Sequence, residues 1–147
     1  MTGTTQLTIA ASLSFIAAFM HLLIIMGGAD WYRFFGAGEK MAELAEQGSI
    51  QPAVITLFIA GVLSVFGLYA LSAAGIILEL PLLKLGLCLI TAVYLLRGLA
   101  GFVLPFVSSH PAVTDNSVTF WILSSIICCL VGGFYLWGII NRWTQLS

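Results

Sequence analysis

Long apolar runs separated by short polar connections dominate the pattern of residues along this chain. Four runs reach the roughly 20 residues that a helix needs to cross the hydrocarbon core of a bilayer. None of them alternates with a period of two, so only helices could satisfy their backbone groups in lipid. The pattern predicts an all-α membrane protein, a single-domain antiparallel bundle of four transmembrane helices over residues 7–28, 53–78, 82–107 and 118–140.

The composition also favours a membrane environment over a soluble fold. Of the 147 residues, 61% are hydrophobic and only 7% are charged, whereas soluble domains carry about 25% charged residues. A small soluble domain has too little interior to bury so much apolar surface. The net charge is −1 and no basic cluster occurs, so nucleic acid is excluded as a partner. We expect the lipid bilayer to be the main partner.

The first connection, residues 29–52, predicts a short helix at the membrane surface. An aromatic cluster follows the first apolar run, as is usual where a helix leaves a bilayer. The segment GEKMAELAEQG then predicts about two helical turns, with Met41 and Leu44 on one face and the glutamates on the other. Gly48 supplies the C-terminal stop. This helix would lie flat on the membrane or cap the bundle.

The second connection, residues 108–117, is a short polar loop containing His110, which we expect to be solvated. Either Asn116 or Ser117 would cap the N-terminus of the fourth helix, because a short polar side chain there can accept a hydrogen bond from a free backbone N–H.

The basic residues predict the orientation of the chain. If the N-terminus is cytoplasmic, Lys84 and Arg142 lie inside, and Arg33 and Lys40 lie outside. The numbers are equal, but the first two directly adjoin membrane spans and the free amino terminus adds to their side. We therefore expect both termini in the cytoplasm of a cell whose inner membrane holds the protein. The first span has no basic residue before it, unlike a signal peptide, and is interpreted as a retained helix.

Rows of small residues predict close helix packing in the membrane, where apolar burial gives little drive for association. The fourth span has two such rows, and the first span has a third that ends at His21. These faces could join helices within one chain, in a homodimer or in a larger membrane complex. The rows are Ser124, Cys128 and Gly132; Ser125, Cys129 and Gly133; and Ala10, Ser14, Ala17 and Ala18.

Arg97 is the most unusual residue, because it lies deep within the third span. An arginine at such depth costs about 2.5–3.5 kcal/mol on insertion scales, and no Asp or Glu lies within any span. His21 lies at a similar depth, Tyr94 and Gly101 share the face of Arg97, and Ser124 and Ser125 could contribute hydroxyl groups.

Three interpretations of Arg97 stay open. It could extend outward and bind Asp30, Glu39 or backbone carbonyls, which would fix the first connection. It could pair with an acidic residue of another subunit. It could also line an outward-facing polar pocket for an anionic or carbonyl-bearing ligand, such as an anionic lipid or a quinone. The residues expected in that pocket are Arg97, His21, Tyr94, Ser124 and Glu39.

The sequence favours a ligand-binding membrane protein without enzymatic activity. A single histidine inside the membrane cannot form a bis-histidine haem site, and the three cysteines form no C-x-x-C motif. We expect no cofactor and no metal. Two alternatives remain: an accessory or assembly subunit of a larger membrane complex, and a proton-coupled small-molecule transporter with His21 as the titrating group.

Several segments resemble a known group of proteins. The stretches are WYRFFGAGEKMAELAEQGS, FGLYALSAAG, LPLLKLGL and YLLRG, within residues 31–101. They are similar to small bacterial four-helix inner-membrane proteins that have no assigned activity. The resemblance implies a bacterial inner-membrane setting, and it transfers no site residue to this chain.

Overall fold

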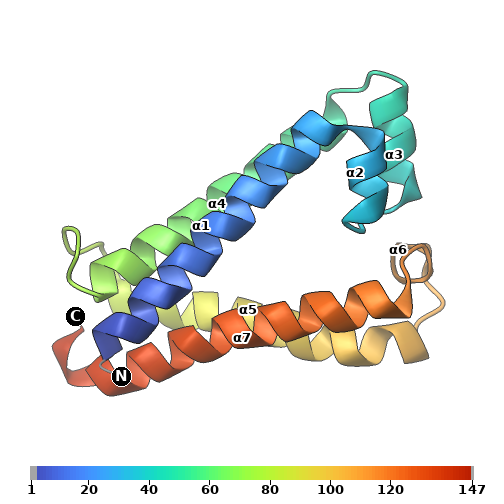
Figure 1. Cartoon of the computed structure of the whole chain (residues 1–147). Helices are drawn as coiled ribbons and strands as arrows, with labels where there is room; N and C mark the ends of the chain where they lie inside the picture. Colours follow the sequence, from blue (N-terminus) through green and yellow to red (C-terminus); the bar gives the residue numbers. More distant parts are fainter. Residues whose placement is uncertain (1–2, 147) are drawn as a thin grey trace.

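The computed structural model describes residues 3–146, apart from the side chain of Ala112, and contains only helices in that part of the chain (Figure 1). The long helices coincide with the predicted spans, and the predicted surface helix is present as α3. The long helices are α1 (Gly3–Gly27), α4 (Gln51–Ala73), α5 (Leu83–Val107) and α7 (Val118–Arg142); the short ones are α2 (Ala29–Phe34), α3 (Glu39–Glu46), α6 (Pro111–Thr114) and the 3₁₀ helix η1 (Trp143–Gln145).

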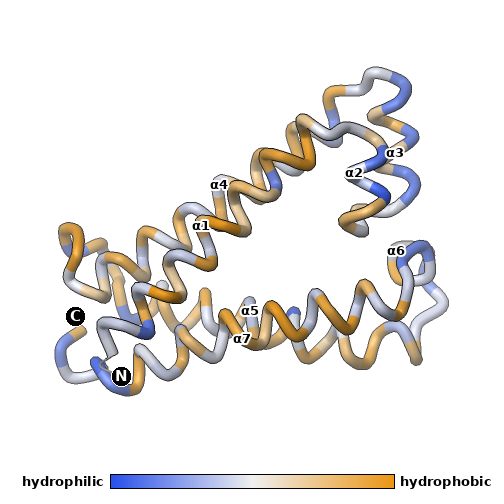
Figure 2. The backbone as a smooth tube through the Cα atoms, in the orientation of Figure 1, coloured by the Kyte–Doolittle hydropathy of each residue, from blue (hydrophilic) through white to orange (hydrophobic). Residues whose placement is uncertain are grey.

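Four helices are long and apolar enough to cross a membrane, which suggests a multi-pass membrane protein. Their outward faces carry large apolar side chains that are more than half exposed, such as Phe58 at 72% and Leu96 at 66%. Figure 2 shows the same division along the chain: the long helices are mainly hydrophobic, and the polar residues gather in α2, α3 and the loop around α6, and again at the end that carries the termini.

The second span ends earlier than its hydrophobic pattern predicts. Helix α4 stops at Ala73 rather than at residue 78, because Gly75 takes a left-handed conformation (φ +77°) that turns the chain. The Ser72 hydroxyl holds the turn: it donates to the carbonyl of Leu78 and accepts from the N–H of Leu80, both at 2.9 Å.

The loop connections begin and end at the expected capping residues. Helix α3 stops just before Gly48, which has φ +73°, and the Ser117 hydroxyl accepts a hydrogen bond of 3.1 Å from the N–H of Phe120 at the start of α7. Ser117 rather than Asn116 is therefore the cap.

The four long helices form two antiparallel pairs, α1 with α4 and α5 with α7, that meet at the end carrying both termini and diverge toward the other end (Figure 1). The sequence predicted a compact antiparallel bundle; the structure contains the antiparallel pairing, with the two pairs closest together at the end that carries the termini. Small residues join the pairs where they converge: Gly138 of α7 lies against Leu7 of α1, so closely that a methyl group at Gly138 would collide with it. We call the other end, with α2, α3 and α6, the loop end.

The predicted small-residue rows of the fourth span lie mainly against α5. A methyl group at Gly98 would collide with Cys129, and one at Gly132 would lie 2.8 Å from a methyl carbon of Leu95. The first-span row is also interior, since Ala10 and Ser14 are fully buried. Close backbone approach through small side chains thus holds α5 against α7 along much of their length.

A cluster of buried hydroxyl groups connects the two helix pairs on the side of the termini, before they separate toward the loop end. Ser14 Oγ lies 3.0 Å from the hydroxyls of both Tyr94 and Tyr135, and Tyr135 donates to the carbonyl of Phe66 at 2.8 Å. Because Tyr135 has one hydrogen and gives it to Phe66, Ser14 must donate to Tyr135, and Tyr94 must donate to Ser14. The chain of hydrogen bonds touches all four long helices and leaves no hydroxyl hydrogen free.

Candidate functional site

Arg97 extends from α5 toward the loop end and lies over α7. Its Nη2 donates to Ser124 Oγ at 3.3 Å, and its Cζ lies 4.8 Å from the ring centroid of Trp121. Ser124 and Trp121 are six and three residues past the start of α7, which places the guanidinium about 5–9 Å inside that helix end. The side chain therefore carries its charge outward from a deep α-carbon, as one of the three interpretations of the sequence proposed.

Two buried polar atoms beside Arg97 have no hydrogen-bond partner. They are Nη1 of Arg97 itself and Oγ of Ser125, a fully buried side chain. Both atoms lie next to Gly101: a Cβ at that position would be 2.7 Å from Nη1 and would collide with Oγ. Because Gly101 has no side chain, the guanidinium of Arg97 fits between α5 and α7. The two unsatisfied polar atoms, Arg97 Nη1 and Ser125 Oγ, lie next to Gly101.

Trp121 is held in position by a hydrogen bond to the second connection. Its indole Nε1–H donates to the carbonyl of Val113 at 3.0 Å, and only 9% of the residue is exposed. The hydrogen bond connects α7 to α6, so the aromatic face against Arg97 is held by the second connection. A cation over a held tryptophan ring gains about 0.5–2 kcal/mol, depending on how fully it is desolvated.

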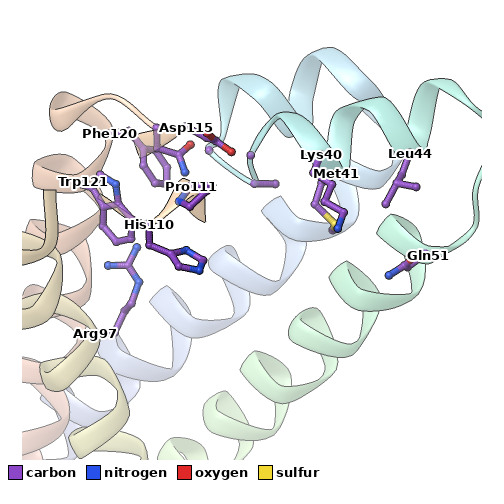
Figure 3. A pocket seen from close by; sticks show the side chains of 14 residues that line it. Lys40, Met41, Leu44, Gln51, Arg97, His110, Pro111, Asp115, Phe120 and Trp121 are labelled. Atoms are coloured by element: carbon purple, nitrogen blue, oxygen red, sulfur yellow. The ribbon is translucent and has the colours of Figure 1, made fainter. Parts of the chain in front are cut away.

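Arg97 lies at one side of a pocket of about 560 Å³ at the loop end (Figure 3). Both helix pairs contribute to it, since α3 and the loop before it form one wall and α5, α6 and α7 form the other. We call it the Arg97 pocket. Its lining consists of Gly36, Ala37, Gly38, Lys40, Met41, Leu44, Gln51, Arg97, His110, Pro111, Asp115, Asn116, Phe120 and Trp121.

The pocket combines a mainly apolar lining with an excess of positive charge. Met41, Leu44, Phe120 and Trp121 supply apolar surface, while Arg97 and Lys40 face a single carboxylate, that of Asp115. The sequence-based view of His110 as a plain solvated residue is incomplete, because this exposed side chain also lines the pocket.

The carboxylates expected near Arg97 bind Arg33 instead. Arg33 makes ion pairs of 2.6 Å with Glu39 and 2.7 Å with Glu46, and a longer one of 3.7 Å with Asp30. The hydrogen bonds that Arg33 donates to the carboxylates of Glu39 and Glu46 raise the pKa of Arg33, and its hydrogen bond to Glu39 lowers the pKa of that carboxyl. Among residues 3–146 these three carboxylates therefore pair with Arg33, and none of them pairs with Arg97.

Four of the five predicted site residues lie outside the lining of the Arg97 pocket: Ser124, which accepts a hydrogen bond from the guanidinium, Glu39, which binds Arg33, and Tyr94 and His21. Tyr94 belongs to the buried hydroxyl cluster and stacks on Tyr135, with ring centroids 5.6 Å apart. Nδ1 of His21 lies 2.7 Å from the Ala17 carbonyl, and since a carbonyl only accepts, Nδ1 carries the hydrogen. Of the five predicted residues, the structure brings together Arg97 and Ser124.

The sequence reasoning missed Trp121, Phe120 and Lys40 as members of the site, whereas it had named Ser125 as a possible source of a hydroxyl group. Only Trp121 carried a usable signal, because a tryptophan near a helix end can take a cation on its ring while its N–H finds a partner. The part of the chain that the structure describes has no group of three or more His, Cys, Asp or Glu that could hold a metal ion.

Comparison of the chain with protein-family models, with curated proteins and with solved structures gives no match. The chemistry of the Arg97 pocket therefore follows from its own geometry.

Proposed function

We propose that this chain is an integral protein of a bacterial inner membrane that binds a small anionic or amphipathic ligand through Arg97, without catalysing a reaction. Both termini would lie in the cytoplasm, so the Arg97 pocket would face the outer side. Four apolar helices of sufficient length support the membrane setting.

The observation that carries this proposal is the unpaired guanidinium nitrogen of Arg97. Nη1 is buried and has no hydrogen-bond partner, and no carboxylate among the described residues neutralises the charge. A buried donor without a partner costs about 1–3 kcal/mol, and more when it is charged. An oxyanion in the Arg97 pocket would supply both the missing acceptor and the missing negative charge.

The apolar part of the ligand follows from the rest of the lining. The rings of Phe120 and Trp121, together with Met41 and Leu44, would contact a hydrocarbon or aromatic portion. A ligand pocket with mostly apolar walls and a few placed polar groups is the usual arrangement in proteins. Lys40 would add a second positive charge at the wall formed by α3.

The serine nearest to the guanidinium supports binding rather than catalysis. Ser124 accepts from Arg97 and gives its own hydrogen to the Trp121 carbonyl at 3.1 Å. An activated serine needs a base as its acceptor, and a backbone carbonyl is no base. Ser124 thus acts as a positioning residue for the guanidinium.

The test is a binding measurement with two phosphate probes on purified protein in a mild nonionic detergent. Inorganic phosphate and dodecyl phosphate would be titrated, with native mass spectrometry as the readout. We expect at least one of them to bind wild type and to bind Arg97→Gln at least tenfold more weakly. Arg97→Lys should lose much of the affinity as well, because an ammonium lacks the planar fork of the guanidinium.

Arg33→Gln is the matched control, since it removes an arginine whose charge is already paired with carboxylates. It should bind both probes as wild type does. If neither probe binds wild type, or if Arg97→Gln and Arg33→Gln bind equally while the circular dichroism of both matches wild type, the proposal is wrong.

A further inference from the structure

The Arg97 pocket lies at the loop end, toward which the two helix pairs diverge (Figure 1), and the side chains beyond the hydroxyl cluster indicate which ligand fits beside it. On α1, Ser14 is fully buried, but His21, two turns later on the same face, is only half-buried. The pair formed by α5 and α7 therefore covers α1 more fully at Ser14 than at His21. Figure 1 shows that the two pairs diverge toward the loop end.

Small or polar side chains occupy the faces that the two pairs turn toward each other beyond the hydroxyl cluster. Ala17 and His21 of α1 lie there, and Ser124 and Cys128 of α7 continue the face of Tyr135, which reaches α1. All four are half-buried. We call this set of residues the inter-pair face.

The outward surface of the same helices has a different character. Large apolar side chains dominate it, with Ile16, Phe19 and Leu123 exposed at 58%, 59% and 57%. A surface meant only for bilayer lipid has no need of a histidine, and the half-buried small residues of the inter-pair face offer a contact surface for a narrow apolar body beside a polar end.

The way in from the aqueous side is narrowed by the first connection. Gly36, in the loop between α2 and α3, lies so close to the ring of Phe120 that a methyl group would collide with it. Gly36 has φ +73°, which a glycine adopts at little cost. The loop between α2 and α3 therefore covers the start of α7. A ligand would then approach Arg97 from the side, between the two helix pairs.

The depth of the guanidinium suits a ligand that resides in the membrane. At about 5–9 Å inside the start of α7, Arg97 can be reached by an acidic headgroup that dips slightly from the bilayer interface. A chain attached to that headgroup would then continue inward along the inter-pair face, past Ser124 and Cys128 toward Tyr94.

We infer that the ligand is an anionic membrane lipid that enters sideways between the two helix pairs, with its phosphate on Arg97 and an acyl chain along the inter-pair face. This inference rests on the proposed function and names the source of the oxyanion. The phosphate binds the guanidinium of Arg97 in the pocket, and Lys40 adds its charge from the opposite wall.

The experiment compares two probes that share the glycerol phosphate headgroup. One is 1-oleoyl lysophosphatidic acid, which has a chain, and the other is glycerol 3-phosphate, which has none. Both are titrated against the full chain in nanodiscs of phosphatidylcholine, with bound species counted by native mass spectrometry. We expect wild type to bind the lipid at least tenfold more tightly than glycerol 3-phosphate, and Arg97→Gln to lose that binding.

A matched pair of variants tests the route of the chain. His21→Phe places a bulky ring on the inter-pair face, and Leu22→Phe places the same ring at the next position, which is 38% exposed on the outer surface. We expect the first to weaken lipid binding at least fivefold and the second to leave it unchanged. If His21→Phe fails to fold, Ala17→Leu fills the same face with a smaller side chain.

The outcomes separate the inference from the proposed function. If glycerol 3-phosphate binds as tightly as the lipid and depends on Arg97, while His21→Phe and Ala17→Leu change nothing, the Arg97 pocket takes a soluble anion and the lipid inference is overturned. If neither probe depends on Arg97, both proposals are wrong.

Discussion

Ser14 on α1 and Tyr135 on α7 connect the two helix pairs through a hydroxyl–hydroxyl hydrogen bond of 3.0 Å. Both residues are fully buried, and Tyr135 passes the connection on to α4 through the Phe66 carbonyl. These two hydrogen bonds therefore hold α1, α7 and α4 together within the buried core.

Removing hydroxyl groups from this cluster should lower the free energy of unfolding, by an amount that depends on which hydroxyl is lost. Tyr135→Phe removes the side-chain donor to the Phe66 carbonyl and the acceptor of the Ser14 hydrogen, whereas Tyr94→Phe removes only a donor to Ser14. Hydrogen bonds between membrane helices contribute about 0.6 kcal/mol on average and up to about 1.7. We expect Tyr135→Phe to lower the free energy of unfolding by about 1 kcal/mol and Tyr94→Phe by less, as measured by denaturant titration in mixed micelles. Equal losses would contradict the assigned direction of the hydrogen bonds.

Gly101 should be intolerant of even one added carbon. In Gly101→Ala the new methyl group would collide with Ser125 Oγ and press on Arg97 Nη1. Overpacking of this kind costs about 1–3 kcal/mol, and the guanidinium should also move. The prediction is a lower melting temperature together with weaker dodecyl phosphate binding. Gly133→Ala on α7 is the control, because its added methyl would meet no atom within 4 Å, and it should behave as wild type.

The ion pairs around Arg33 should make the fold of α2 and α3 sensitive to acid. The pKa of Glu39 is lowered in the folded chain by the hydrogen bond from Arg33, so its contribution is complete at neutral pH and is lost as the pH falls through that lowered pKa. Below about pH 4 we expect the indole NMR signal of Trp31, in α2, to broaden or shift.

Glu39→Gln is the control for that transition. It should weaken the contact with Arg33 already at neutral pH, and the acid-dependent change of the Trp31 signal should be smaller. An identical acid transition in the variant would assign the effect to another group.

The proposed orientation predicts which surfaces a membrane-impermeant thiol reagent reaches. Glu43 on α3 and Gln145 in η1 are both exposed and lie at opposite ends of the molecule. In spheroplasts, which lack the outer membrane, Glu43→Cys should react and Gln145→Cys should react only after lysis. Unmodified chain is the background control, because Cys88, Cys128 and Cys129 are free thiols within apolar helices. The reverse labelling pattern would place both termini outside.

The sequence by itself determined the secondary structure and the unusual status of Arg97. Apolar runs of about 20 residues leave the backbone no alternative to helices in lipid. Gly48 predicted the stop of α3 and Asn116 or Ser117 the cap of α7, whereas the turn at Gly75 that ends α4 was not predicted. The small-residue rows also predicted close packing, since their spacing of four places them on one helix face. These are local properties, which depend on neighbours in the chain.

Only the tertiary structure decided how the polar groups are paired. From the sequence, the same carboxylates could pair with either Arg33 or Arg97. It could not show that α2 and α3 fold against each other and bring Glu39 and Glu46 to Arg33. The separation of the helix pairs was equally hidden, because the rotation of each helix about its axis sets which face meets its neighbour. That rotation buries Tyr94 with Ser14 and Tyr135, keeps it out of the Arg97 pocket, and leaves Arg97 Nη1 without a partner.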